Sequence, residues 1–256
     1  MIKYLKLITI ILITFIPRQT IAQEIYVVEG DTVYLYNNVE TMTMKKILGI
    51  IPNGTVVEVI DKINDSFWKV RFYGNEGFVS TEFLLLPEHS KKYSGWLKDK
   101  FISGTNPDCE NINEQFNDSL DNELKIHVGK RANVVVKLMN ESEECIRIVY
   151  IKRGDTYSVV HIPEGTYYLK LAYGKDLRKF VENGDCKIKF LLDPVYKIGT
   201  NKLNFNIIKK PDSIANGYVY KNWEIPSFEL FLDIDYRQMK LSDFNSNTIS
   251  EEEFNK

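Results

Sequence analysis

Short runs of alternating apolar and polar residues, separated by turn signals, recur along most of the chain. Between residues 47 and 84, four such runs are punctuated by Pro52-Asn53-Gly54 and by Gly74-Asn75-Glu76-Gly77. A period of two places successive side chains on opposite faces of a strand, and clusters of glycine, proline and asparagine end strands. The pattern therefore predicts a small all-β barrel in this part of the chain.

One strand of this barrel, residues 67–72, shows the alternation most clearly. The period of two places Trp68, Val70 and Phe72 on one face, and Lys69 and Arg71 on the other. We expect the first set to face the core. Alternatively, Trp68 lines a ligand groove, because its large ring and its indole N–H also suit the wall of such a groove.

A second group of alternating or continuously apolar runs follows from residue 124 onwards. Turn signals lie at 153–155, 163–165 and 174–176, between runs rich in valine, isoleucine, leucine and tyrosine. About seven short strands with turns between them are typical of a Greek-key β-sandwich. The fold class predicted for the whole chain is therefore all-β, a small SH3-like barrel plus a sandwich.

The first 22 residues have the pattern of a secretory signal peptide. Lys3 and Lys6 precede an apolar run from Leu7 to Ile16, and Thr20-Ile21-Ala22 resembles a cleavage site. The run is much shorter than the roughly 20 residues that span a bilayer. The sequence thus predicts an exported protein, periplasmic or secreted, that begins at Gln23 and has no transmembrane segment once processed.

The remaining residues divide into four predicted parts. The barrel covers 23–87 and the sandwich 108–234, and turn formers and helix breakers between them, at 88–107, predict a linker. An element that caps the barrel is the alternative for this segment, given the spacing of Tyr93, Trp96 and Leu97. Residues 235–256 form an acidic end that we expect to be solvated and mobile.

Charge and metal-ligand spacing exclude several functions. Removal of residues 1–22 takes away three basic residues and no acidic one, so the formal charge changes from −2 to −5. A mildly acidic chain without a basic stripe is a poor binder of nucleic acid. His89, His127 and His161 are scattered and no Cys-x-x-Cys pair exists, so neither a metal nor a cofactor is expected.

The three cysteines of the chain allow at most one internal disulfide. Export places them where disulfides persist. Cys145 and Cys186 both fall at strand ends inside the second domain, which favours a bridge between these two and leaves Cys109 as the spare thiol.

Motifs for catalysis were not found. Cys109 lies in the acidic context Asp108-Cys109-Glu110, which opposes thiolate formation. There is no Gly-x-Ser-x-Gly elbow and no Gly-x-x-x-x-Gly-Lys phosphate loop. The sequence therefore predicts no catalytic residues, and an enzyme would need a site that converges only in three dimensions.

The barrel segment resembles bacterial SH3 (SH3b) domains. The positions that carry the resemblance are Pro52 with Gly54, Trp68, Gly74 with Gly77, and Phe78 with Val79. Such modules bind cell-wall or protein ligands and do no chemistry themselves, so the resemblance implies recognition or tethering. Where the family has a Leu-x-Val-Arg-x-Gly-Pro-like signature beside its ligand groove, this chain has Tyr34-Leu35-Tyr36-Asn37-Asn38.

The second domain looks like exported prealbumin-like or carboxypeptidase regulatory-like sandwiches. The resemblance rests on the stretches 150–157, 162–169 and 172–176, and it implies no particular activity. Together the two resemblances imply a binding or scaffolding protein of a bacterial envelope. The alternative is an accessory subunit of a peptidoglycan hydrolase or of a secretion system.

Three aromatic residues are the candidate ligand-binding side chains. Tyr34, Tyr36 and Trp68 lie in or near the altered stretch of the barrel, and aromatic side chains provide large contact areas with polar tips. The expected partner is a cell-wall peptide or glycan, or an envelope protein. For Tyr36 the alternative is a place in the barrel core.

Overall fold

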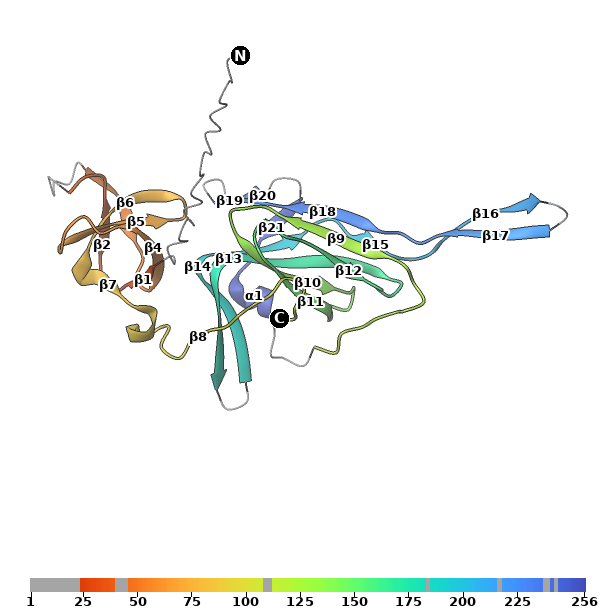
Figure 1. Ribbon diagram of the computed structural model, residues 1–256, viewed down its shortest axis with the longest axis horizontal. Helices are drawn as coiled ribbons and strands as arrows, with labels where there is room; N and C mark the ends of the chain where they lie inside the picture. Colours follow the sequence, from red (N-terminus) through yellow and green to blue (C-terminus); the bar gives the residue numbers. More distant parts are fainter. Residues whose placement is uncertain are drawn as a thin grey trace, which may run out of the picture.

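The computed structural model describes residues 24–39, 46–107, 112–182, 185–215, 218–236, 240–241 and 244–256. These residues form an N-terminal barrel and a C-terminal sandwich, which lie next to each other (Figure 1). The all-β fold class is confirmed. The predicted signal peptide and its cleavage site lie outside the described residues.

The barrel is a curled sheet of short antiparallel strands in the order β3-β2-β6-β5-β4-β1-β7. Its core contains Val33, Val57, Val70 and Val79, each at most 1% exposed. The strands are β1 Ile25–Val28, β2 Val33–Tyr36, β3 Ile47–Ile51, β4 Thr55–Asp61, β5 Phe67–Phe72, β6 Asn75–Ser80 and β7 Leu84–Leu85, and the 3-10 helices η2 Thr81–Phe83 and η3 Pro87–His89 follow β6 and β7.

The faces of β5 agree with the predicted alternation, because Trp68 and Phe72 pack against the same core cluster as Val70. The predicted glycine turn differs in detail. Its two central residues are Tyr73 and Gly74, both with positive φ, as a tight two-residue hairpin requires. Gly77 instead lies within β6, where an added Cβ would be 2.6 Å from Leu35 Cγ. The absence of a side chain at Gly77 therefore allows β2 and β6 to approach each other closely.

The sandwich has a large and a small sheet. The large sheet has the order β11-β10-β13-β14-β21, and the small one has the order β12-β9-β18, in which β18 runs parallel to β9. The remaining strands are β8 Leu97–Lys98, β9 Glu123–Val128, β10 Asn133–Met139, β11 Cys145–Ile151, β12 Thr156–Val160, β13 Thr166–Glu182, β14 Asp185–Gly199, β15 Leu203–Asn204, β16 Ile208–Ala215, β17 Tyr218–Glu224, β18 Phe228–Leu232, β19 Ile234–Asp235, β20 Lys240–Leu241 and β21 Ser246–Thr248.

The turn predicted at 174–176 is an irregularity inside the long strand β13. The register of β13 against β14 shifts between Tyr173 and Lys175, and Asp176 has a φ of 53°. A side chain at Gly174 would collide with Phe190, since an added Cβ would be 2.4 Å from Phe190 Cβ. A bulge of this kind bends a strand without ending it. β13 and β14 therefore continue as one long hairpin.

Both faces of the large sheet are buried. The inner face packs against the small sheet around Ile126, Val134 and Leu169, all fully buried. The outer face carries a second cluster, which includes Val135, Tyr150 and Phe190. Phe101 and Ile112 of the segment before β9 pack on this second cluster, and so does the C-terminal helix α1 Glu251–Asn255.

The predicted mobile C-terminal end is therefore wrong for the part that the structure describes. Phe254 is 3% exposed and its ring packs at a tilt against Tyr196, with 5.5 Å between ring centroids. The Nζ of Lys170 donates a 2.8 Å hydrogen bond to the Glu253 carbonyl, and Lys189 forms an ion pair of 2.7 Å with Glu251. The helix is therefore held on the sheet by the buried Phe254 ring and by these two lysine contacts.

The segment predicted as a linker is ordered and partly buried, closer to the capping alternative. Tyr93 is 4% exposed and its hydroxyl donates a 3.0 Å hydrogen bond to the Gly54 carbonyl. The Trp96 ring packs at a tilt against Phe180 of β13, and β8 pairs with β13. The segment thus connects the barrel to the sandwich through packed side chains.

A shared apolar cluster joins the two units. Ile25, Val27 and Val56 of the barrel pack with Leu191 and Leu192 of β14, around Tyr93. These residues come from both units, so neither unit buries its whole apolar surface alone.

A polar network lies beside this cluster. The backbone N–H of Tyr73 donates a 3.2 Å hydrogen bond to Asp193 Oδ1, and Lys175 Nζ lies 3.6 Å from Asp193 Oδ2 and from Glu58 Oε2. Burial raises the pKa of the Asp193 carboxyl, and the Lys175 ammonium opposes part of that rise. Burial also raises the pKa of Tyr73 to about 12. The β5–β6 turn is therefore fixed to the sandwich by buried polar contacts.

The predicted bridge between Cys145 and Cys186 is wrong. Cys186 takes part in a disulfide, whereas Cys145 carries a thiol that donates to the Arg147 carbonyl at 3.2 Å. β10 and β13 lie between β11 and β14, which places the two cysteines about 14 Å or more apart at ordinary strand spacing. A disulfide needs Cα atoms within about 7 Å. Cys109, predicted as the spare thiol, lies outside the described residues.

A candidate ligand-binding face on the barrel

Strand β2 presents two tyrosines on the outside of the barrel. Val33 and Leu35 point into the core, so the period of two turns Tyr34 and Tyr36 outward. Their ring centroids are 6.1 Å apart and both side chains are half-buried. The structure therefore does not place Tyr36 among the buried core residues.

A small groove lies beside these tyrosines. It has a volume of about 90 Å³, and Phe67 and Phe83 form apolar parts of its wall, while Ser80 and Glu82 supply polar atoms. The Tyr36 and Phe67 rings meet edge to face, 6.3 Å apart, and Ser80 Oγ donates a 2.9 Å hydrogen bond to Glu82 Oε1. Aromatic walls with a few polar atoms at one side suit a peptide side chain or a sugar ring.

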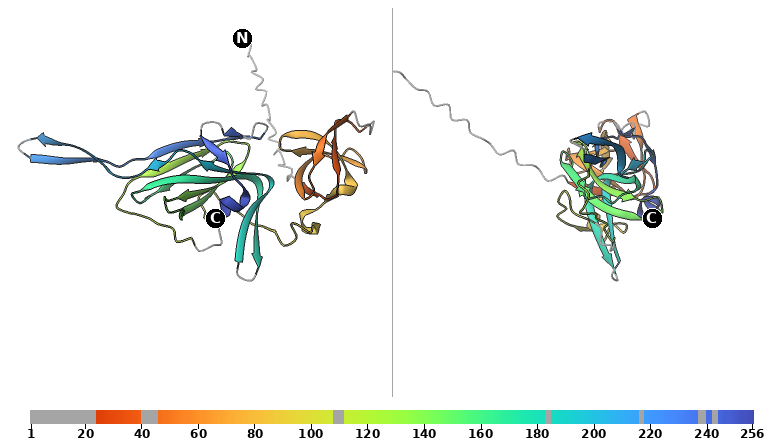
Figure 2. Two further views of the ribbon diagram at one scale, coloured as in Figure 1. Left: turned by 180° about the vertical axis from the view of Figure 1, so that it is seen from behind. Right: turned by 90° about the vertical axis from the view of Figure 1, so that its right-hand side faces the viewer.

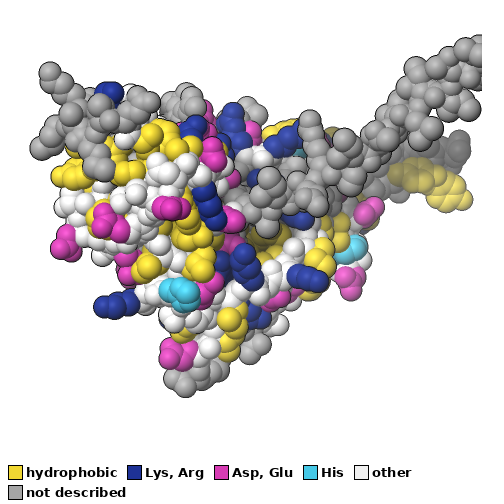
Figure 3. Space-filling view, turned by 60° about the vertical axis from the view of Figure 1, so that its left-hand side comes forward, with side chains coloured by type: hydrophobic (Ala, Val, Ile, Leu, Met, Phe, Trp, Pro, Cys, Tyr) yellow, Lys and Arg dark blue, Asp and Glu magenta, His cyan; other side chains and the backbone are white. Residues whose placement is uncertain are grey.

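The apolar surface continues from the groove onto the neighbouring strand β3. Ile50 lies directly opposite Tyr34 and is 59% exposed, and Leu48 is 53% exposed. We call Tyr34, Tyr36, Leu48, Ile50 and Phe67 together the aromatic face, in which Phe67 is only 8% exposed and forms the base. Figure 3 looks toward the barrel end of the molecule and shows hydrophobic side chains gathered on its surface. Contiguous exposed apolar side chains of this kind mark interaction sites.

Trp68, the third predicted ligand residue, does not belong to the aromatic face. Its ring meets Tyr26 edge to face at 5.0 Å, and Lys62 Nζ lies 4.6 Å from the ring centroid. It also packs against the barrel core. Phe67 and Trp68 are adjacent in β5, so they point to opposite faces, and Phe67 takes the position beside Tyr36.

Sequence reasoning missed Phe67, Phe83, Leu48 and Ile50. Phe67 carried a usable signal, because the alternation puts it on the same face as Lys69 and Arg71, where an aromatic residue is out of place. Leu48 and Ile50 are separated by Gly49, with Ile47 and Ile51 on either side. A run that is apolar at almost every position does not tell which side faces the core.

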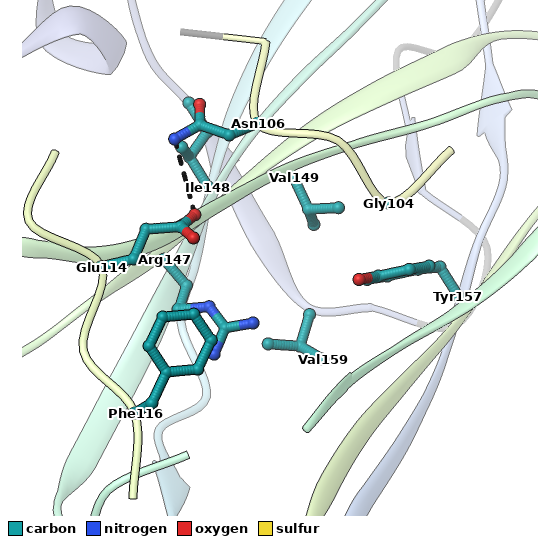
Figure 4. Close-up of a pocket in the computed structure, with 9 residues that line it drawn as sticks. All are labelled: Gly104, Asn106, Glu114, Phe116, Arg147, Ile148, Val149, Tyr157 and Val159. Atoms are coloured by element: carbon teal, nitrogen blue, oxygen red, sulfur yellow. Dashed lines mark hydrogen bonds between the residues drawn. The ribbon is translucent and has the colours of Figure 1, made fainter. Parts of the chain in front are cut away.

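A second pocket lies between strands β11 and β12 and four residues that precede β9, namely Gly104, Asn106, Glu114 and Phe116 (Figure 4). It has a volume of about 220 Å³. The Arg147 guanidinium lies 4.0 Å from the centroid of the Phe116 ring and donates a 3.2 Å hydrogen bond to the Val160 carbonyl. Burial lowers the pKa of Arg147. These contacts hold Phe116 over the sheet, which gives Arg147 a structural role.

A row of three polar side chains lies on the exposed face of the small sheet. We call Thr156, His127 and Glu229 the histidine row. His127 Nδ1 is 2.8 Å from Thr156 Oγ1, and His127 Nε2 is 2.7 Å from Glu229 Oε1. The residues sit on three neighbouring strands, and His127 also stacks on Phe231 with ring centroids 4.5 Å apart. Such rows arise from ordinary cross-strand pairing. His161 is elsewhere, with its Nδ1 3.0 Å from the Leu120 carbonyl.

The described residues contain no group of three or more His, Cys, Asp or Glu residues that could hold a metal ion. No helix in the same part of the chain is long and apolar enough to cross a membrane.

Comparison with known proteins agrees with the barrel geometry. Residues 43–84 match the family profile described as bacterial SH3 domain. The match covers less than half of the chain, so it identifies the kind of module that the barrel is similar to. Searches of curated proteins and of solved structures gave no match. The likeness of the second unit to prealbumin-like sandwiches stays a prediction.

Proposed function

We propose that this protein is an exported binding or scaffolding component of a bacterial envelope, which recognises its ligand through the barrel. One observation carries the proposal: an aromatic face with an adjoining groove lies on a module similar to bacterial SH3 domains. The similarity of the barrel to that family suggests binding to the cell wall. Tyr34 and Tyr36 would provide the contact area above the buried Phe67 ring, and Glu82 a carboxylate for a ligand amide, hydroxyl or ammonium group.

The ligand class that fits best is a cell-wall peptide or glycan. A groove of about 90 Å³ accepts a single side chain or part of a sugar ring, and the exposed Leu48 and Ile50 extend the contact beyond it. An envelope protein that presents an apolar side chain would use the same surface. The sandwich would then act as a rigid support, because the shared cluster around Tyr93 fixes the barrel to it.

We further propose that the protein is not an enzyme. The cysteine thiol, the histidine row and the buried arginine each have a structural explanation in their surroundings. An accessory role in a peptidoglycan hydrolase or a secretion system stays the alternative, since the same binding face would serve a partner subunit. An enzyme with an unrecognised site is a third, less favoured possibility.

The test is a pull-down with the processed chain, from Gln23 to the C-terminus, on purified peptidoglycan and on envelope protein extracts. Retention on peptidoglycan supports the leading proposal, and capture of one envelope protein by the barrel face supports the alternative. Retention on neither contradicts recognition by the barrel. Mass spectrometry of the native protein tests export, because a species that keeps Met1 contradicts cleavage after Ala22.

A further inference from the structure

A long two-stranded arm leaves the sandwich. Strands β16 and β17 pair only with each other among the described strands, and Figures 1 and 2 show the arm reaching far beyond the sheets. Eight residues in a strand extend about 26 Å. A lone hairpin is marginally stable in water and buries little apolar surface. Its side chains are therefore available for an external contact.

The outer half of the arm is apolar and free of charge. Between Asp212 and Lys221 the sequence carries no charged residue. Ile214 is 77% exposed, Tyr218 70%, Val219 62% and Tyr220 49%. We call these four residues the arm tip.

The arm tip is apolar on both of its faces. Ile214 and Val219 are direct cross-strand partners and share one face. Tyr218 and Tyr220 flank Val219 in β17, and so they lie on the opposite face. A flat protein surface would cover only one of these two faces. A surrounding medium, such as the boundary layer of a lipid bilayer, covers both.

Basic residues lie directly behind the arm tip. This part of the arm contains three lysines, Lys209, Lys210 and Lys221, and two acidic residues, Asp212 and Glu224, so its net charge is +1. Lys210 forms an ion pair of 2.5 Å with Glu224. Lysines set back from an apolar tip lie at the level of lipid headgroups when the tip enters the interface, and anionic lipids attract them. Tyrosine is enriched at that same level.

We propose that the arm tip inserts into the interfacial layer of an anionic lipid membrane. Insertion stops at the headgroup level, because both edges of the two-stranded arm keep unpaired backbone groups that need water. The contact would hold the protein at a membrane surface while the barrel binds its own ligand. It is independent of what the barrel binds.

The experiment is flotation of the processed chain with vesicles made of equal parts phosphatidylglycerol and phosphatidylcholine. We expect the protein to float with these vesicles, less so in high salt, and poorly with pure phosphatidylcholine. The double variant Ile214→Ser, Val219→Ser should lower the floating fraction about tenfold, because it removes the aliphatic side chains from one of the two faces of the arm tip. Ile102→Ser, at a 66% exposed position outside the arm, is the matched control and should float like the wild type.

Other results would overturn the proposal. These are absence of flotation for the wild type at low salt, equal flotation of the double variant, and capture of an envelope protein by the arm without any vesicle binding. Circular dichroism checks that the variants are folded. Tyr36→Ala, which alters the barrel, should float normally, so failure of the arm and failure of the barrel proposal give different results.

Discussion

The Tyr93 hydroxyl donates a hydrogen bond of 3.0 Å to the carbonyl of Gly54, which links the segment after the barrel to the β3–β4 turn. Gly54 has a φ of 74°, a conformation that favours glycine in a turn. The Tyr93 ring fills the cluster shared by the barrel and β14. This contact makes the two units interdependent, although each has a core of its own.

The first prediction concerns this shared cluster. Tyr93→Ala should lower the free energy of unfolding by about 3 to 5 kcal/mol, because it empties a buried aromatic position. Tyr93→Phe should lower it by only about 1 kcal/mol, the contribution of one hydrogen bond. Urea unfolding followed by tryptophan fluorescence and by circular dichroism measures both. Two separated transitions in the wild type would contradict a shared cluster.

The second prediction concerns the approach of β2 to β6, which positions Tyr36. Gly77→Ala should destabilise the protein by about 1 to 3 kcal/mol, because the new methyl group would meet Leu35 Cγ at 2.6 Å and the Tyr36 carbonyl at 2.8 Å. Gly49→Ala is the control, since no atom lies within 4 Å of its added Cβ. Thermal melting compares the two variants. Equal melting temperatures would contradict the close approach.

The third prediction concerns the C-terminal helix. Phe254→Ala should lower the free energy of unfolding by about 3 kcal/mol, because the ring is buried on the outer face of the large sheet. Glu252→Gln changes a side chain that is 82% exposed and should have little effect. Denaturant unfolding measures both. A Phe254→Ala variant as stable as the wild type would restore the expectation of a mobile end.

The fourth prediction is an effect of alkaline pH at the barrel–sandwich contact. The pKa of Tyr73 is raised from 10.0 to about 12 by burial, with Asp193 adding to the rise. The unfolded chain therefore loses this proton first, so stability falls as the pH rises from about 10 through 12. Tyr73→Phe lacks this contribution, and its stability should decline less steeply over that range. Parallel curves from denaturant titrations at several pH values would contradict the raised pKa.

The strands with strict alternation could be predicted from the sequence, as β5 illustrates. Trp68, Val70 and Phe72 face the barrel core, and the polar Lys69 and Arg71 alternate with them along the strand. The bulge at Gly174 could not be predicted in this way. A glycine followed by lysine and aspartate has the composition of a turn, and only the contact with Phe190 shows that the strand continues.

The C-terminal helix shows a second limit. Its residues Glu251, Glu252 and Glu253 have the composition of a solvated end. Lys189 and Lys170, which bind the Glu251 carboxylate and the Glu253 carbonyl, are distant in the sequence. Only part of the candidate binding site could be predicted, because one of its residues is also distant in the sequence. Tyr34 and Tyr36 are two residues apart on one strand, so the sequence places them on one face. Phe67 joins them only through the folding of the barrel.

The most direct test of the central proposal compares ligand retention with stability for Tyr36→Ala. Because the Tyr36 ring is half-buried on the aromatic face, we predict a folded variant whose binding to peptidoglycan, or to the captured envelope protein, is weaker by at least about 1 kcal/mol. Ile63→Ser, at a 44% exposed barrel position outside that face, should bind like the wild type. A Tyr36→Ala variant that stays folded and binds as well as the wild type would contradict the account. A Tyr36→Ala variant that melts early and recovers full binding on cooling would also contradict the account.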